Sequence, residues 1–191
     1  MRYIIVTLVF AALVLVGGTI AGEREQVDRA NLSPLKPIGV RIQSLPKMRV
    51  ACVRNIGPYE KTGPAWKELI EVANKRGLID KTTDFLGLYY DDPGRTPAEK
   101  LRCDVCITVD KGMAALEDLT IKYAGGHEYA MAIHIGPHEN LMDTYKFIFE
   151  KGLSELRRTY TSGPVIEIYK NDPEHTPPNE LVTEVYVPLK P

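Results

Sequence analysis

Two stretches of the chain repeat one pattern, and this repeat constrains the fold more than any other feature. Residues 85–109 read FLGLYYDDPGRTPAEKLRCDVCITV, and residues 165–189 read VIEIYKNDPEHTPPNELVTEVYVPL. A shift of 80 places Tyr89 on Tyr169 and Asp104 on Glu184. Two long copies indicate an internal duplication, because solenoids repeat a shorter unit more often. The sequence therefore predicts two similar halves around a pseudo-twofold axis, with a site in the seam.

The composition is that of a folded domain. Of 191 residues, 44% are apolar and 26% are charged, which excludes a largely disordered chain. A net charge of -1 without a basic block argues against nucleic-acid binding. Cys52, Cys103 and Cys106 do not make a disulfide framework, and no second Cys pair or His pair completes a zinc site. We expect buried cysteines, and neither a metal nor a cofactor.

The first 22 residues predict export. Arg2 is followed by an uncharged stretch from Tyr3 to Gly22, which is typical of a secretory signal or of an uncleaved membrane anchor. The pattern leaves cleavage and retention both open. Residues 23–37 are polar and predict a linker. We expect residues 38–191 to lie in a bacterial periplasm or on an inner-membrane anchor, outside the cytoplasm.

Both halves, 38–110 and 118–191, predict the same order of strand, strand, helix, strand, strand. The expected strands are 40–45, 49–56, 85–90 and 100–109, then 119–123, 128–135, 165–169 and 181–189. The strands 119–123 and 128–135 are expected to pair around Gly125-Gly126. Helices are expected from Pro64 to before Gly77, and over the apolar face that Leu141 to Leu156 mark. This order predicts an α+β fold, an antiparallel sheet with helices on one face.

The alternation within the strands predicts a ligand site on the other face. Val105 and Val185 belong to apolar sets that should lie under the helices. If Leu88 and Ile168 are core as well, the far face collects aromatic and acidic side chains: Tyr89, Asp104, Glu167, Tyr169, Glu184 and Tyr186. Aromatic walls with a few carboxylates are typical of a pocket for an apolar or cationic ligand. A merely solvated sheet face is the alternative.

Several motifs resemble the GyrI-like small-molecule-binding family, which includes the bacterial DNA gyrase inhibitory protein and the effector-binding domains of AraC-type multidrug regulators. The similar segments are Ile56-Gly57-Pro58-Tyr59, Tyr89-Tyr90-Asp91-Asp92-Pro93, Lys100-Leu101-Arg102-Cys103-Asp104 and Thr183-Glu184-Val185-Tyr186-Val187-Pro188. The resemblance covers residues 38–191. It implies two strand-helix-strand-strand modules that form a cleft, and lipophilic, often cationic, ligands. It also implies that Glu184, at the family's acidic position in the last strand, contacts the ligand.

The resemblance leaves more than one function open. The leading hypothesis is a periplasmic or membrane-anchored module that binds a small hydrophobic or cationic molecule without turnover. Some similar family members hydrolyse cyclopropanoid electrophiles, so a hydrolase that uses Glu184 or Glu167 as its base is the second hypothesis. A protein-interaction module is the third. Because no helix-turn-helix segment precedes the domain and export separates it from gyrase, neither transcriptional regulation nor gyrase inhibition is expected.

Overall fold

The computed structural model describes residues 39–110, 112–113 and 117–191. The predicted signal or anchor in residues 1–22 and the linker therefore lie outside the described residues. In the described ranges, no helix combines the length and the apolar character needed to cross a bilayer.

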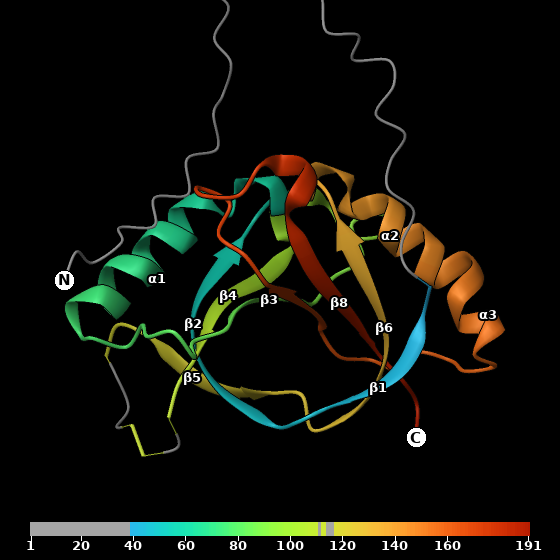
Figure 1. Cartoon of the computed structure of the whole chain (residues 1–191), viewed down its shortest axis with the longest axis horizontal. Coiled ribbons are helices and arrows are strands. Elements are labelled where there is room, and N and C mark those ends of the chain that lie inside the picture. Colours follow the sequence, from blue (N-terminus) through green and yellow to red (C-terminus); the bar gives the residue numbers. More distant parts are fainter. Residues whose placement is uncertain (1–38, 111, 114–116) are drawn as a thin grey trace, which may run out of the picture.

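Eight strands form one antiparallel sheet that curls into a half-barrel (Figure 1). The strands are β1 (Arg41–Leu45), β2 (Met48–Ile56), β3 (Phe85–Tyr89), β4 (Arg102–Thr108), β5 (Thr120–Ala124), β6 (His127–Ile135), β7 (Val165–Tyr169) and β8 (Val182–Pro188). Their spatial order is β1-β6-β8-β7-β3-β4-β2-β5. The central neighbours β3 and β7 come from different halves, so the pseudo-twofold axis of the duplication passes between them. The predicted α+β fold and its two similar halves are confirmed.

Two helical segments cover the outer face of the sheet, one on each side of its centre, and their axes diverge (Figure 1). The first is α1 (Gly63–Lys75), and the second runs through α2 (Leu141–Phe147), a π-helical turn η5 (Ile148–Gly152) and α3 (Leu153–Glu155). Pro64 stands in the first turn of α1, where the missing N–H of proline costs nothing. Short 3-10 turns complete the fold: η2 (Tyr59–Lys61), η3 (Ala98–Lys100), η4 (His138–Asn140) and η6 (Pro178–Glu180).

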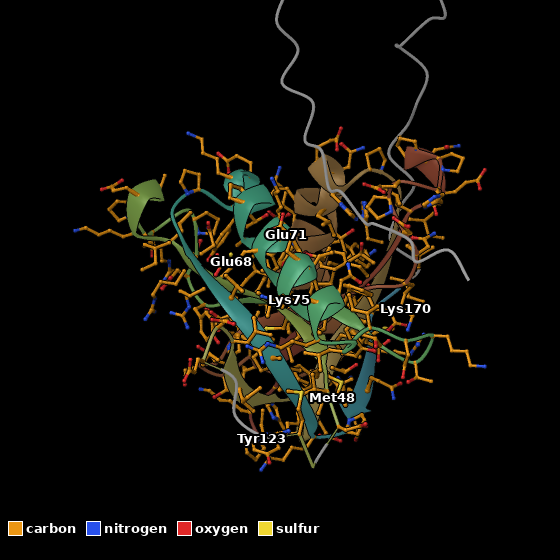
Figure 2. The ribbon with its side chains drawn as sticks, turned by 90° about the vertical axis from the view of Figure 1, so that its left-hand side faces the viewer. Met48, Glu68, Glu71, Lys75, Tyr123 and Lys170 are labelled. Carbon is orange, nitrogen blue, oxygen red and sulfur yellow. A yellow bond between two sulfur atoms is a disulfide. The ribbon has the colours of Figure 1, made fainter. Side chains whose placement is uncertain are left out.

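Helix α1 is amphipathic, and its two sides explain its orientation. Trp66 and Leu69 are buried against the sheet together with Val105 and Ile107 of β4. The opposite side carries charge, and Figure 2 shows Glu68, Glu71 and Lys75 pointing away from the sheet. This spacing of apolar and charged residues is what fixes one face of a helix on a sheet.

The first strand of each half pairs with the other half. Strand β1 pairs with β6, and β5 pairs with β2. The prediction that 119–123 pairs with 128–135 is therefore wrong. The two strand connections cross instead, and the Gly126 N–H donates to the carbonyl of Leu45 over 2.8 Å. Gly125 has φ +79°, and a Cβ there would lie 2.2 Å from the carbonyl oxygen of Pro46, so the crossing requires a glycine.

Curling gives the sheet two buried faces rather than one. The helix side holds the α1 cluster around Val105 and an α2 cluster around Val185. The inner, concave side holds a third cluster: Leu45, Val50, Cys52, Leu86, Leu88, Cys106, Ala124, Tyr129, Met131, Ile166, Ile168 and Tyr186. A disulfide between Cys52 and Cys106 joins β2 to β4 within this cluster. Buried cysteines were predicted correctly, whereas the disulfide was not expected. Cys103 is a free, buried thiol, and burial raises its pKa to about 11.

Candidate binding pocket

A cavity of about 1820 Å³ lies between the two helices, above the central strands β3 and β7. It is larger than the roughly 300–1,000 Å³ of an ordinary small-molecule pocket. The side chains at its centre are mostly aromatic: Tyr59, Trp66, Tyr89, His138, Tyr145, Glu167 and Tyr169. The sequence predicted a cleft in the seam of the halves, and the structure has one. However, the prediction placed the site on the sheet face opposite the helices, whereas the cavity lies on the helix side.

Glu167 is the carboxylate at the centre of this pocket, and it is only 4% exposed. The Tyr145 hydroxyl of α2 donates to its Oε1 over 2.6 Å, and the Tyr169 hydroxyl donates to its Oε2 over 2.8 Å. The Tyr89 hydroxyl lies 2.8 Å from that of Tyr169 and extends the network. Three tyrosines from both halves therefore fix the carboxylate in one orientation.

Gly87 explains how so many large side chains fit over the central strands. It stands directly opposite Glu167 in the β3–β7 register and occupies the equivalent position of the other half. A Cβ at Gly87 would lie 2.6 Å from the Tyr89 ring and 3.1 Å from the Tyr169 hydroxyl. The absence of a side chain at Gly87 thus leaves the space that the two tyrosine rings occupy. At the equivalent position, the other half has the carboxylate of Glu167.

Burial sets the titration behaviour of the centre. Burial raises the pKa of Glu167 above its usual value, and the hydrogen bonds from Tyr145 and Tyr169 offset this only in part. Burial also raises the pKa of Tyr89, Tyr145 and Tyr169 well above 10, because a phenolate would lie in a dry site beside Glu167. The tyrosines therefore remain hydrogen-bond donors at physiological pH, and the carboxyl is the group that can change charge.

Edge-to-face aromatic contacts hold the walls of the pocket. The ring centroids of Tyr59 and Tyr89 are 5.0 Å apart, and those of Trp66 and Tyr169 are 5.6 Å apart. His138 packs against Tyr169 from the other side, and burial lowers its pKa. A neutral His138 and rigid aromatic rings present π-faces that suit apolar and cationic groups.

The six predicted site residues do not share one face. Tyr89, Glu167 and Tyr169 line the pocket, whereas Asp104, Glu184 and Tyr186 lie on the concave side, opposite Leu88, Ile168 and Ile166 in the strand registers. The single-face prediction is wrong because it assumed one apolar side per strand. In a curled sheet both sides are buried, so the apolar residues Leu88 and Ile168 did not mark the helix side.

Asp104 already has cationic partners. It is 1% exposed and forms ion pairs with Arg54 and Lys122, and the Tyr90 hydroxyl donates to its Oδ2 over 2.7 Å. Burial acts to raise its pKa, but the bonds from Arg54, Lys122 and Tyr90 outweigh it and lower that pKa. Asp104 is thus a satisfied structural charge.

Glu184 and Tyr186 form a second concave-side pair. The Tyr186 hydroxyl donates to Glu184 over 3.0 Å, and Lys170 Nζ lies 3.8 Å from the same carboxylate oxygen. Tyr186 packs edge-on against Tyr129 of the inner cluster. Tyr89 and Tyr169, which were predicted to share a face with Glu184, lie on the other side of the sheet.

Four central residues were not predicted as site residues: Tyr59, Trp66, His138 and Tyr145. A signal for them was present in the sequence. A shift of 79 places Tyr59 on His138 and Trp66 on Tyr145, two aromatic pairs at the start of each helix. Equivalent positions of a duplicated unit lie on opposite sides of the pseudo-twofold axis, so the pairs that are close to this axis face each other across the seam.

Comparison with known proteins agrees with this architecture. A DNA gyrase inhibitor from Enterobacter lignolyticus is 33% identical over 128 residues, which cover 64% of this chain and 80% of that protein. A DNA gyrase inhibitor from Salmonella arizonae is 28% identical over 149 residues, which cover 75% of this chain and 93% of that protein.

Solved structures share the fold at low sequence identity. The EcmrR chain in an EcmrR–DNA complex has a TM-score of 0.64 and 19% identity; the match covers 79% of this chain but only 57% of that one. A hydrolase from Listeria innocua has a TM-score of 0.58 and 12% identity, over 82% and 94% of the two chains. SAV2435, solved bound to tetraphenylphosphonium, has a TM-score of 0.53 and 14% identity, over 80% and 94%. At these identities the likeness extends to the fold alone.

The family assignment comes from the sequence. The profile of the GyrI-like small molecule binding domain matches residues 39–190, which include both halves and every residue of the pocket centre. This chain belongs to the GyrI-like small-molecule-binding family.

Proposed function

We propose that the protein is an exported or membrane-anchored binding protein for lipophilic cations, which it holds in the pocket between its halves. The observation that carries this proposal is Glu167. Among the described residues, no Lys, Arg or His forms an ion pair with it, and its partners are tyrosine hydroxyls alone. An ionised carboxylate in a dry site is costly without a counter-charge. A cationic ligand supplies that charge and buries its own apolar surface against the aromatic walls.

The charge around the cavity supports the same ligand class. Nine carboxylates but only four lysine and arginine side chains line the cavity, a formal excess of five negative charges. The full chain carries a net charge of only -1. Negative charge is therefore concentrated at the pocket, and a cleft lined by one sign of charge raises the local concentration of the opposite ion.

Two observations support export. The uncharged segment from Tyr3 to Gly22 is typical of a signal or an anchor. The Cys52–Cys106 disulfide belongs to the described domain, and disulfides persist mainly in oxidising compartments such as the bacterial periplasm.

Calorimetry with tetraphenylphosphonium at low salt tests the binding proposal. We expect wild type to bind and Glu167→Gln to bind about tenfold more weakly or worse, equivalent to roughly 1.4 kcal/mol. The affinity for neutral triphenylphosphine oxide should fall much less in Glu167→Gln. The matched control is Glu184→Gln, which removes a carboxylate on the other side of the sheet. Equal affinity of wild type and Glu167→Gln for the cation would refute the proposal.

The pH dependence of binding gives an independent check. The pKa of Glu167 is raised above its usual value, so acidic solutions protonate the carboxyl and remove the counter-charge. Affinity for tetraphenylphosphonium should rise as the pH rises through this raised pKa and then level off. The Glu167→Gln profile should be flat over the same range.

A hydrolase is the second candidate, and the raised pKa of Glu167 favours it. A buried carboxyl with a raised pKa is suited to general acid–base chemistry near neutral pH. The test is incubation with a cyclopropane-containing electrophile and mass spectrometry of the products. A ring-opened product heavier by one water, formed by wild type but not by Glu167→Gln, would establish turnover. Recovery of unchanged substrate together with measurable binding would reject the hydrolase and support binding without turnover.

A further inference from the structure

The cavity continues past Glu167 along the second helical segment, and we name this extension the α2 arm. Its lining includes the charged side chains Lys146 and Glu150 together with three large, exposed apolar side chains. Met142, Phe149 and Tyr160 line it, and their exposed fractions are 50%, 41% and 50%. The described residues include six exposed large hydrophobic side chains, and these three are half of them. Exposed apolar groups that gather in one place mark a binding surface more often than scattered ones do.

The corresponding arm beside α1 has a different chemistry. A shift of 79 places Phe149 on Ile70, which is only 3% exposed, and a shift of 80 places Tyr160 on Asp80. Asp80 accepts hydrogen bonds from the backbone and hydroxyl of Thr82, so a polar turn lines that side of the cavity. The duplicated halves have thus diverged where a long ligand would extend from the centre.

The geometry of the α2 arm suits a narrow apolar chain. Tyr145, which contacts Glu167, is followed one helical turn later by Phe149, about 6 Å further along the helix axis. The rings of Phe149 and Tyr160 meet edge to face with centroids 5.3 Å apart, so they join the helical segment to the loop that precedes β7. A group anchored at Glu167 could therefore extend over both rings.

We infer that the pocket takes a single-tailed cationic amphiphile, with its head group at Glu167 and its apolar tail in the α2 arm. This inference rests on the proposed binding of lipophilic cations and specifies their shape. A compact cation would cover Glu167 and leave Met142, Phe149 and Tyr160 in water. An alkyl tail removes these side chains from water, and each methylene that it buries there tightens binding.

The test is a series of alkyltrimethylammonium ions from butyl to dodecyl, titrated by calorimetry below the concentration at which they form micelles. For wild type we expect the dissociation constant to fall about two- to fourfold per added methylene until the tail exceeds the arm. The double variant Phe149→Ala/Tyr160→Ala should flatten this series while leaving the affinity for tetramethylammonium within about twofold. The matched control is Tyr123→Ala, because Tyr123 is 59% exposed and lies away from α1 at the far end of the molecule (Figure 2).

The outcomes separate this inference from the proposed function. A wild-type affinity that does not change with tail length contradicts the tail site, even if tetraphenylphosphonium binds through Glu167. A length series that the double variant leaves as steep as in wild type also contradicts it. If no cation depends on Glu167 but neutral alkanols show a length series that Phe149→Ala/Tyr160→Ala flattens, the proposed cation site is refuted and the tail site alone stands.

Discussion

At the residue scale, two buried carboxylates of this domain have opposite surroundings. Asp104 lies beside Arg54 and Lys122, and its pKa is lowered. Among the described residues, Glu167 has only tyrosine hydroxyls as partners, and its pKa is raised. The first carboxylate stabilises the folded state as a charge, whereas we propose that the second receives its counter-charge from a bound ligand. The sequence analysis placed both carboxylates in one ligand site, because residue type and strand alternation do not show which cations lie beside a carboxylate.

Substitution of these two carboxylates should change stability in opposite directions. We expect Asp104→Asn to lower the free energy of unfolding at pH 7 by roughly 1.5–3 kcal/mol, because hydrogen bonds to a charged group are lost. Folded Asp104 binds fewer protons than the unfolded chain, so this difference should shrink as the pH falls through its lowered pKa. Glu167→Gln should instead raise stability at pH values above the raised pKa of Glu167, because it removes a buried charge there. Urea denaturation from pH 3 to 7 measures both effects, and a destabilised Glu167→Gln would contradict this assignment.

At the scale of the elements, the sequence located strands better than it paired them. Every predicted strand agrees with an observed one to within two residues, because alternation and the Gly and Pro residues at strand ends are local signals. The exchange of β1 and β5 between the halves was missed, since no local signal records which distant edge a strand will meet. The prediction was also wrong about which side chains of β3 and β7 point toward the helices, because the curled sheet buries both sides of these strands.

Gly87 offers a test of how β3 shapes the pocket. A Cβ in Gly87→Ala would contact the end of the Tyr89 side chain, which can rotate, so we expect a stability cost of about 1 kcal/mol. The displaced Tyr89 ring should lose its contact with Tyr169 and reduce affinity for tetraphenylphosphonium several-fold. Calorimetry and urea denaturation of Gly87→Ala and of the control Gly112→Ala, where a Cβ meets nothing within 4 Å, separate the two effects. Unchanged affinity in Gly87→Ala would show that the position of Tyr89 does not matter for binding.

At the scale of the whole molecule, the duplication predicted the existence of the site and the symmetry that builds it. The location of the cleft in the seam followed from the repeat, and Tyr89 and Tyr169 followed from their equivalent positions. The curl could not be predicted in the same way. It depends on the exchanged strands β1 and β5, and it decides which sheet face remains open to a ligand.

Export is the prediction that concerns the full chain. A reporter that is active only outside the cytoplasm, fused after Pro37, should be active in cells if residues 1–22 direct export. Recovery of the fusion in washed membranes would favour a retained anchor, and release with the periplasmic fraction would favour cleavage. A fusion without residues 2–22 is the control and should be inactive. An inactive fusion that is present at full length in the cytoplasm would refute export.

The facing pair Gly87 and Glu167 also bears on the ancestry of the fold. A homodimer of the single ancestral unit would place the same residue at both positions beside its twofold axis. Two glutamates directly opposite each other on paired strands would repel, and two glycines would provide no charge. A lone carboxylate at the axis is therefore incompatible with strict symmetry. It requires both copies of the unit to lie in one chain, where each position can differ from its counterpart.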